Sequence, residues 1–402
     1  MRIGIDASRA FVKNPTGTER YACEVITRIL RLPEARNHTW VLYVKPGQMQ
    51  SIAEADFKRM SQVKVKVIPL KYLWTQLGLA WRTWVDRLDV LWVPAHTLPV
   101  LRNPKLNTVV TIHGIEYEWL PAYENRLQRW YLPLSTKYAL GQADKIIAVS
   151  EFTKKQLIER MRADPNKITT ILEGFEVQDG GQSLGARDTA KIFHKYKIKS
   201  KQYLLFVGTV QPRKNLVRLI EAFSKLIHRL KKTDLKLVIC GKLGWSYSEV
   251  VSAPQKNQIQ DRVVITDYVD NSTREILLSN ALAYVQPSIT EGFGLPVLEA
   301  MAAGVPVVSS RGGALSEILR MPNATRTVTP GVKTADFEYR VLGDFAGGLF
   351  DPEDVDGMAD LLELAVKNPT LLREMTRRGG MQSQGFGWDK AAIETYRLLT
   401  SF

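Results

Sequence analysis

Residues 291–300 read Glu-Gly-Phe-Gly-Leu-Pro-Val-Leu-Glu-Ala, and this stretch restricts the fold more than any other part of the chain. An apolar run precedes it at 281–285 and another follows at 305–309, which predicts strand, loop, helix and strand in that order. Pro296 suits the first turn of the helix, where its missing N–H costs nothing. A helix amino terminus that follows a glycine-rich loop is a site for anions, most often phosphate.

The residue types of this loop suit a phosphate that carries a sugar. Gly292 and Gly294 let the backbone N–H groups of the loop approach a ligand closely. Glu291 lies in the loop, and Glu299 lies about one turn into the helix. Carboxylates bind phosphate poorly, but they accept hydrogen bonds from sugar hydroxyls. A glycine-rich connection with two solvated glutamates is the plainer alternative. The two carboxylates around one turn make the sugar-phosphate site the preferred interpretation.

Alternating strand and helix patterns extend from this stretch through the whole chain, which predicts an α/β fold with two doubly wound, Rossmann-like domains. The N-terminal domain is predicted to cover residues 1–180 and the C-terminal domain residues 200–387. Residues 174–200 are polar and glycine-rich and are predicted to form the linker. The predicted strands cover residues 2–5, 40–44, 63–68, 90–93, 109–113, 145–150, 203–208, 235–240, 263–265, 283–285 and 305–309. Ligands of such sheets bind at the carboxyl ends of the strands.

A second loop of the C-terminal half carries two cations. It reads Gly208-Thr-Val-Gln-Pro-Arg-Lys-Asn215, follows a predicted strand and precedes an amphipathic helix that Asn215 can cap. Arg213 and Lys214 would oppose the dipole of that helix, so their position is understandable if they hold an anion. Two solvated surface cations are the alternative.

Three residues of the N-terminal half are candidates for the same site. Gly17 opens a helix after the first strand and would let the backbone approach a sugar or phosphate. His113 lies at the end of a predicted strand, although a lone histidine is more often structural. His96, in Pro94-Ala-His96, is the weakest candidate of the three.

The composition indicates a soluble, cytoplasmic protein. The 402 residues are 45% hydrophobic and 24% charged, and the two cysteines, Cys23 and Cys240, provide no disulfide framework. No apolar stretch approaches the roughly 20 residues that span a bilayer. Residues 1–174 hold 26 Lys and Arg against 16 Asp and Glu, a net charge of +10. This excess predicts an anionic partner for the first half, with a basic surface kept for solubility as the alternative.

An acidic string and a tryptophan-rich segment each allow two interpretations. Asp354-Val-Asp356 could hold a divalent cation, but it precedes a predicted helix, where acidic residues favour the amino terminus. We therefore predict no metal site. Residues 71–92 contain four of the nine tryptophans, at positions 74, 81, 84 and 92. On one α-helix, Trp74, Trp81 and Trp84 would share a face. We favour a face that packs on the core over a helix in the membrane interface.

The spacing of Glu291 and Glu299 resembles the E-x7-E signature of retaining glycosyltransferase family 4, the group 1 enzymes that include bacterial mannosyltransferases of polysaccharide and lipopolysaccharide assembly. Residues 300–308 and 312–317 continue the resemblance without a gap. It implies the GT-B fold, with two Rossmann-like domains facing across a cleft. It also implies that the terminal helix, residues 388–402, returns to the N-terminal domain.

The resemblance assigns roles to individual residues. Glu291 would bind the transferred sugar, Lys214 would grip the donor diphosphate, and His113 would contact the donor sugar; these three are the predicted catalytic residues. Family members often have a second cation soon after the glycine of the 208–215 loop, and Arg213 is its substitute here. The donor-binding residues that the resemblance implies are Arg213, Gly17, Thr209, Gly292, Phe293, Gly294, Leu295 and Glu299.

The predicted reaction is metal-independent, retaining transfer of a sugar from a nucleotide-diphospho-sugar, with GDP-mannose favoured over UDP-sugars and no cofactor. The predicted acceptor is a glycan or a lipid-linked molecule in surface polysaccharide or glycolipid synthesis. The sequence leaves open whether the acceptor is anionic and whether the protein contacts the inner face of the membrane peripherally. No nucleic-acid partner is expected. A GT-B nucleotide-sugar epimerase is one alternative, but it would need an acid/base pair. A non-catalytic, basic nucleic-acid-binding protein is the other, and it leaves the paired glutamates unexplained.

Overall fold

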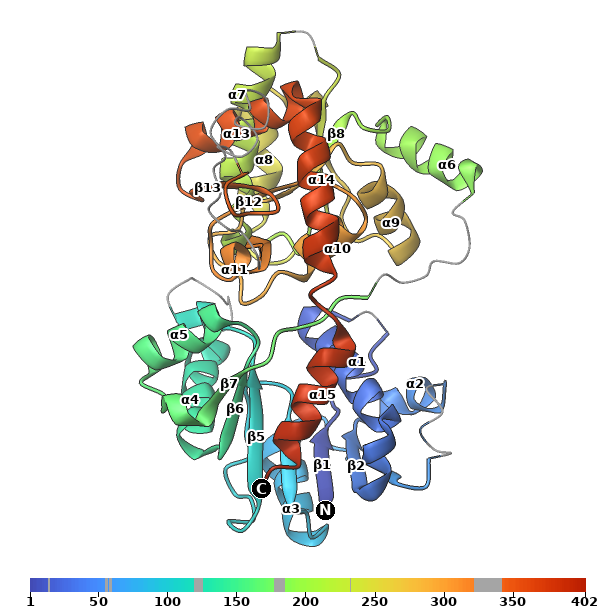
Figure 1. Cartoon of the computed structure of the whole chain (residues 1–402), viewed down its shortest axis with the longest axis vertical. Coiled ribbons are helices and arrows are strands. Elements are labelled where there is room, and N and C mark those ends of the chain that lie inside the picture. Colours follow the sequence, from blue (N-terminus) through green and yellow to red (C-terminus); the bar gives the residue numbers. More distant parts are fainter. Residues whose placement is uncertain are drawn as a thin grey trace, which may run out of the picture. The chain divides into compact units, whose positions relative to one another are not determined.

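The computed structural model describes residues 1–13, 15–54, 57, 60–118, 126–176, 185–231, 233–321 and 342–402. These residues form two compact units, each of which contains one parallel β-sheet covered by helices (Figure 1). Unit 1 consists of Met1–Gly174 and Phe386–Phe402, and unit 2 consists of Phe175–Gly385. No helix of the described residues is long and apolar enough to cross a membrane.

Unit 1 contains a seven-stranded sheet with the order β3-β2-β1-β4-β5-β6-β7. Its strands are β1 (Arg2–Asp6), β2 (Thr39–Val44), β3 (Val63–Val67), β4 (Val90–Val93), β5 (Asn107–Ile112), β6 (Lys145–Ala148) and β7 (Ile168–Thr170). Its described helices are α1 (Gly17–Arg31), α2 (Met49–Glu54), α3 (Ala80–Val85), α4 (Arg126–Gln142), α5 (Glu151–Met161) and α15 (Trp388–Leu399), with a π-helical turn, η4 (Trp74–Leu79), before α3. Short 3₁₀ turns occur at η1 (Pro33–Asn37), η2 (Pro46–Gln48), η5 (Glu116–Glu118) and η6 (Pro165–Lys167).

Unit 2 contains a six-stranded sheet with the order β10-β9-β8-β11-β12-β13. Its strands are β8 (Tyr203–Val207), β9 (Lys236–Cys240), β10 (Val263–Ile265), β11 (Ala283–Gln286), β12 (Val307–Ser310) and β13 (Gly348–Phe350). Its described helices are α6 (Ala186–Tyr196), α7 (Leu216–Leu230), α8 (Ser248–Lys256), α9 (Asn271–Ser279), α10 (Leu295–Ala302), α11 (Leu315–Leu319), α13 (Val355–Lys367) and α14 (Pro369–Ser383), with 3₁₀ turns η7 (Pro212–Lys214) and η8 (Gln260–Arg262).

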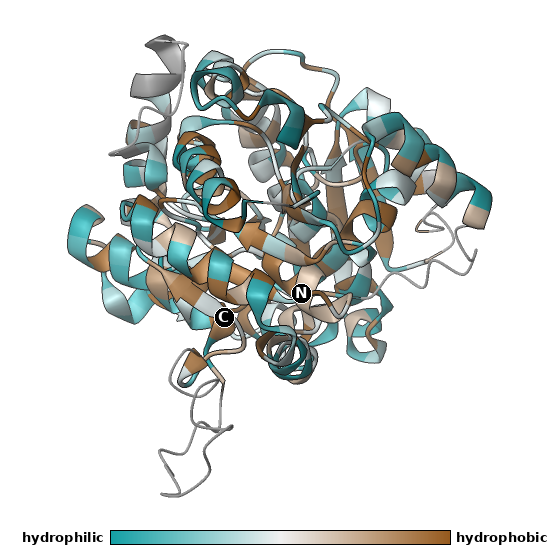
Figure 2. Ribbon diagram, turned by 90° about the horizontal axis from the view of Figure 1, so that it is seen from above, coloured by the Kyte–Doolittle hydropathy of each residue, from teal (hydrophilic) through white to brown (hydrophobic). Residues whose placement is uncertain are grey.

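The central strands are hydrophobic along their whole length because helices cover both faces of each sheet. All five residues of β8 are buried, and so are all four of β4. Figure 2 shows this distribution, with hydrophobic strands inside and hydrophilic faces on the outer helices. The eleven predicted strands are therefore confirmed to within a few residues, whereas the short edge strands β7 and β13 were not predicted.

The terminal helix α15 packs on α1 within unit 1, although the two are separated by most of the chain (Figure 1). Trp388 is buried at the start of α15, and its ring lies 6.2 Å from that of Tyr21 on α1. A Cβ at Gly174 would lie 2.2 Å from the backbone nitrogen of Trp388, so only glycine fits there. The terminal helix thus lies where the resemblance placed it.

Two predictions about local structure were wrong. Residues 186–196, inside the predicted linker, form helix α6 of unit 2. The tryptophan-rich segment does not turn one face to the core, because Trp74 is buried while Trp81 and Trp84 are exposed. A turn of π-helix holds more residues than a turn of α-helix. The π-helical turn η4 therefore rotates the residues that follow it away from the face of Trp74.

Candidate active site

The candidate site lies in unit 2 where the strand order reverses. The chain leaves β8 towards β9 on one side and leaves β11 towards β12 on the other, so the loops after β8 and β11 diverge from neighbouring strands. Such a reversal at the carboxyl ends of parallel strands is the usual place for a ligand. The loop after β8 carries Arg213 and Lys214 in η7, and the loop after β11 carries Glu291.

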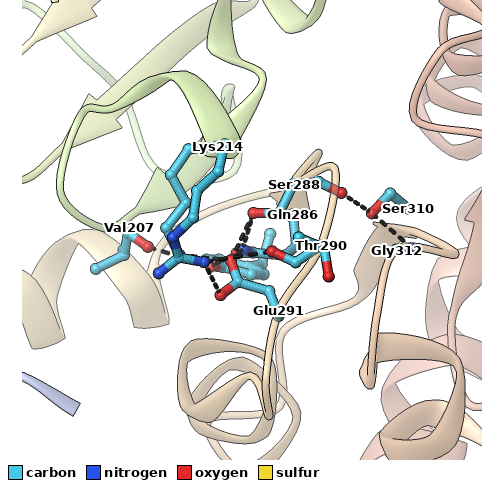
Figure 3. A network of polar contacts seen from close by, with 10 residues as sticks. Val207, Lys214, Gln286, Ser288, Thr290, Glu291, Ser310 and Gly312 are labelled. Carbon is cyan, nitrogen blue, oxygen red and sulfur yellow. Dashed lines mark hydrogen bonds and ion pairs between the residues drawn. The ribbon is translucent and has the colours of Figure 1, made fainter. Parts of the chain in front are cut away.

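The Glu291 carboxylate is the centre of a dense polar network (Figure 3). Its Oε1 accepts from Lys214 Nζ at 2.5 Å, and its Oε2 accepts from Arg213 Nη1 at 2.5 Å. Oε1 also accepts from Ser288 Oγ at 2.6 Å and from Gln286 Nε2 at 2.8 Å. These five residues are called the cation–carboxylate cluster below. Glu291 is thus held by two cations from the other loop and by two polar groups from its own strand end.

The electrostatics of this cluster keep Glu291 ionised. Burial alone would raise the pKa of this carboxyl group, since only 6% of the residue is exposed. The charges of Arg213 and Lys214 outweigh burial and, with the hydrogen bonds from Lys214 and Ser288, lower the pKa of Glu291 to about 2. Two cations face one anion, so the cluster retains one positive charge. Arg213 is the more accessible cation, with 30% of its side chain exposed against 8% for Lys214.

Backbone and amide contacts fix the two loops against each other. The N–H of Ile289 donates to the carbonyl of Arg213 at 2.9 Å. Asn215 is the N-cap residue of α7, as predicted, but its side chain makes no capping bond. Its amide nitrogen instead donates to the carbonyls of Pro287 and Pro352, at 3.1 and 2.6 Å. Asn215 therefore ties the β8 loop to the β11 loop rather than stabilising its own helix.

A third segment supports the Glu291 loop from behind. Ser310, at the end of β12, donates to the carbonyl of Ser288 at 2.5 Å and accepts from the N–H of Gly312 at 3.2 Å (Figure 3). A Cβ at Gly313 would lie 2.3 Å from the carbonyl oxygen of Glu291, and this residue also has a φ of +68°. Only glycine allows this close approach of the two backbones.

The predicted anion-binding turn has the expected form. Gly294 is the N-cap residue of α10 with a φ of +129°, and Pro296 lies in the first turn. Gly292, Phe293 and Leu295 are all buried around it. Beyond the turn, Glu299 is 7% exposed as a residue, and its carboxylate pairs with Arg274 Nη1 of α9 at 2.8 Å.

The remaining predicted donor contact of unit 2, Thr209, is exposed after β8. Gly208 precedes it with a φ of +155°, and its N–H donates to the carbonyl of Cys240 at 2.9 Å. Tyr284 of β11 lies close enough to both predicted glutamates that, after burial, the charges of Glu291 and Glu299 further raise the pKa of its hydroxyl. The structure therefore brings both glutamates into one neighbourhood, as the sequence interpretation required.

The predicted residues of unit 1 gather at the carboxyl edge of its own sheet. His113 follows β5, and its Nδ1 lies 2.9 Å from Glu173 Oε1 while its Nε2 lies 3.0 Å from the carbonyl oxygen of Pro94. A sugar contact by His113 would have to replace one of these bonds. His96 lies 6.1 Å from His113, centroid to centroid, and its Nδ1 is buried without a hydrogen-bond partner in the described part of the chain. Gly17 is the exposed first residue of α1.

The acidic string Asp354-Val-Asp356 begins helix α13, as predicted. The Asp354 carboxylate accepts from the N–H of Gly357 at 2.8 Å, and Asp356 pairs with Lys225 of α7 at 2.6 Å. Among the residues that the structure describes, no three His, Cys, Asp or Glu side chains gather as metal ligands would. Metal independence itself stays a prediction.

Several residues of the site were not found from the sequence. Gln286 and Ser288 could have been noticed as polar residues directly at a strand end, where ligand-binding side chains gather. Glu173 and Arg274 give no such signal, and the sequence indicates Asn215 only as a helix cap, because each of the three acts on a residue far away in the sequence.

Two family models cover most of the chain. Residues 188–381 match the glycosyl transferases of group 1, and residues 15–179 match glycosyltransferase family 4. Among curated proteins, the chain is 27% identical over 294 residues to the O-antigen chain mannosyltransferase B of Escherichia coli, covering 72% of this chain and 70% of that protein. It is 28% identical over 224 residues to the O-antigen chain mannosyltransferase RfbU of Salmonella typhimurium, covering 56% of each protein.

Solved structures show the same fold. A glycosyltransferase from Rickettsia africae superposes with a TM-score of 0.69 at 16% identity, covering all of this chain and 98% of the other. Anabaena HepE in complex with UDP and glucose has a TM-score of 0.68 at 15% identity, and WaaG, a glycosyltransferase of lipopolysaccharide biosynthesis, has 0.67 at 15%. Both of these alignments cover the full length of both chains.

Proposed function

Because this chain belongs to the group 1 glycosyltransferases with the GT-B fold, we propose that it moves a sugar, with retention of configuration and without a metal ion, from a nucleotide-diphospho-sugar to a glycan or lipid-linked acceptor. In this proposal, unit 2 binds the donor and the basic unit 1 binds the acceptor. The observation that carries it is the cation–carboxylate cluster, which places Arg213 and Lys214 at the strand-order reversal of unit 2.

The cluster suits the charge that develops when a diphosphate leaves. As the bond between the anomeric carbon and the phosphate oxygen breaks, negative charge accumulates on the diphosphate. Arg213 and Lys214 would stabilise it, because they are already oriented by Glu291 before the reaction begins. Lys214 is buried, so its charge acts in a medium of low dielectric, where it is worth more than in water. The amino terminus of α10 would add its dipole.

The acceptor would attack the anomeric carbon from the side that the diphosphate leaves. The acceptor hydroxyl forms the new glycosidic bond, and its proton passes to the departing phosphate oxygen. No protein base is needed in this scheme, which agrees with the engagement of Glu291 by two cations. Glu291 would bind the transferred sugar only by exchanging one of its present partners. Glu299 would accept hydrogen bonds from the ribose, with Arg274 holding its carboxylate in place.

The relatives support a choice of donor and pathway. Two of them are mannosyltransferases of O-antigen chains, which favours GDP-mannose and a role in surface polysaccharide assembly. The Anabaena neighbour in complex with UDP makes UDP-sugars the next choice. We place the reaction in the cytoplasm, at the inner face of the membrane if the acceptor is lipid-linked.

Calorimetry with a panel of GDP-, UDP-, ADP- and TDP-sugars would test donor binding. We expect one member of the panel to bind the wild-type protein and to bind the Lys214→Ala variant at least about tenfold more weakly, as for a lost charged hydrogen bond. Lys225→Ala is the matched control, because Lys225 is an exposed cation on α7 that pairs with Asp356. Binding of no nucleotide sugar, or equal binding by the Lys214→Ala variant, would contradict the proposed donor site.

A further inference from the structure

Unit 1 carries an exposed apolar surface around the helical segment 74–85. Half of the exposed large hydrophobic residues in the described part of the chain fall between residues 70 and 101. The apolar patch is defined here as Tyr72, Leu73, Leu77, Trp81, Trp84 and Leu101. Trp81 is 67% exposed and Leu101 is 72% exposed, values that belong to polar surface residues rather than to core residues.

The helical segment is apolar on two sides, and only one of them is used inside the protein. Trp74, Leu79 and Ala80 are buried against unit 1. Leu77, Trp81 and Trp84 recur at steps of four and three residues and lie outside. Apolar residues on a helix are normally packed against a partner, and the outer side of this segment has none among the residues that the structure describes.

Hydrogen bonds hold this patch in a fixed form. The indole N–H of Trp84 donates to the carbonyl of Leu101 at 3.0 Å, which places the two exposed residues side by side. The Gln76 side chain donates to the carbonyl of Leu98 at 3.3 Å and accepts from the N–H of Val100 at 2.9 Å. The patch is therefore formed by two chain segments that are hydrogen-bonded to each other, and not by a single loop. Figure 1 shows α3 at the end of unit 1 that also holds the N-terminus.

The charges within the same segments are mostly positive. Residues 69–105 contain five Lys and Arg and two Asp. One of the two, Asp86, is buried and already paired with Lys66, and the other, Asp89, accepts from the backbone N–H of Arg2 at 2.6 Å. Lys71, whose ammonium lies 5.5 Å from the Tyr72 ring, belongs to the positive set.

We infer that the apolar patch is a membrane-binding surface that inserts into the headgroup region of an anionic bilayer. Tryptophan and tyrosine suit that region because their rings are largely apolar, and neighbouring Lys and Arg pair with anionic headgroups. Charge complementarity favours a bilayer over a second copy of this chain, because a symmetric dimer through the patch would bring two basic surfaces together. The inference goes beyond the proposed function, because membrane binding by this surface does not depend on the identity of the donor or the acceptor.

Vesicle flotation of the full chain tests the inference, without donor or acceptor. Phosphatidylcholine vesicles are compared with vesicles of phosphatidylcholine and phosphatidylglycerol. We expect binding to the anionic vesicles that weakens as salt is raised. The double variant Leu77→Ser, Trp81→Ser should bind the anionic vesicles at least about tenfold more weakly, because both side chains lose their apolar contact with lipid. Val251→Ser with Met381→Ser is the matched control, since both residues are exposed on helices of unit 2.

A second variant guards against an effect on folding. Lys71→Glu with Lys105→Glu changes two exposed residues, and it should lower binding to anionic vesicles while the melting temperature stays at the wild-type value. The inference is wrong if the wild-type protein floats with neither vesicle, or if the serine pair binds like the wild type. It is also wrong if the wild-type protein is a dimer that the serine pair dissociates. A negative result in the vesicle experiment would not affect nucleotide-sugar binding. Failure of the membrane inference is therefore distinguishable from failure of the proposed reaction.

Discussion

The two sheets of this protein share a strand order but differ in the chemistry at their carboxyl edges. Strands β3-β2-β1-β4-β5-β6 of unit 1 are arranged like β10-β9-β8-β11-β12-β13 of unit 2. At the edge of unit 2, a buried carboxylate, Glu291, is held by two permanent cations. At the edge of unit 1, a buried carboxylate, Glu173, is held by one histidine, His113. The topology fixes where the loops meet, and the side chains on those loops decide what can bind there.

The difference between these two carboxylates has a physical consequence for each unit. The pair of cations in unit 2 leaves a net positive charge after Glu291 is neutralised, which suits an anionic leaving group. The pair of His113 and Glu173 in unit 1 leaves no such excess of permanent positive charge. The comparison therefore supports the proposed binding of the diphosphate to unit 2. Measuring how each edge responds to the loss of one group tests that proposal.

Glu291→Gln should have the largest effect on stability. The variant removes the carboxylate charge that Lys214 and Arg213 both contact, and breaking a buried pair in this way costs about 3–5 kcal/mol. Glu173→Gln is the matched change in unit 1 and should cost about 1–3 kcal/mol, as for one buried hydrogen bond. Urea unfolding of both variants measures the difference. Equal losses would show that the two edges are not electrostatically distinct.

Lys214→Ala should lower kcat/KM by about 100- to 1000-fold, the range seen when one preorganised donor to a developing negative charge is removed. The contrast is His113→Ala in unit 1, for which we expect a smaller loss, because both ring nitrogens already bond to the protein. Steady-state kinetics with the donor identified by calorimetry provide the measurement. A greater loss for His113→Ala would reverse the assignment of the leaving group to unit 2.

Acid should weaken the two units over different pH ranges. In unit 1, burial first, and then the charges of His113 and Arg9, lower the pKa of His96 from 6.5 to about 3. The unfolded chain therefore binds a proton at His96 that the folded chain does not, and stability falls as pH drops from about 6.5 towards 3. In unit 2, the pKa of Glu291 is lowered from 4.5 to about 2, so its contribution is lost between about pH 4.5 and 2.

Unfolding free energies measured from pH 7 to 2 separate these contributions. His96→Gln should flatten the upper part of the curve, and Glu291→Gln should flatten the lower part. The interpretation of His96 would be refuted by a wild-type curve that stays level between pH 6.5 and 5.

The smallest expected effect is that of metal removal. If Arg213 and Lys214 neutralise the leaving diphosphate, EDTA should leave the rate of transfer unchanged. The assay compares initial rates with EDTA and with added Mg²⁺. A loss of activity that Mg²⁺ restores would show that the cations of unit 2 are not sufficient.

The sequence predicted most of the fold because its signals are local. Buried parallel strands such as β8 and β11 are continuous apolar runs, and each is followed by a loop with glycine or proline. Gly294 and Pro296 mark the start of α10 for the same reason, since backbone geometry depends on neighbouring residues. The short strand β13 gives little signal because its three residues begin with Gly348, whereas the equally short β10 consists entirely of β-branched residues.

The candidate site was predicted in its members but not in its bonds. Lys214, Arg213 and Glu291 were all named, yet their mutual pairing was not expected, because 77 residues separate Lys214 from Glu291. The prediction for the tryptophan-rich segment 71–92 was wrong for a different reason. Its periodicity predicts one α-helix, whereas the π-helical turn η4 changes the face on which Trp81 and Trp84 lie.

The amino-acid sequence alone determined two sheets of parallel strands, a glycine-rich turn before a helix at 291–300 and a basic first half, because apolar periodicity, glycine and proline geometry and net charge are properties of neighbouring residues. The tertiary structure decided that Glu291 is neutralised by two cations, that Asn215 joins two loops instead of capping its helix, and that Trp81 faces outward. Each of these depends on which distant segments the fold brings within hydrogen-bond or packing distance, and no local pattern encodes that distance.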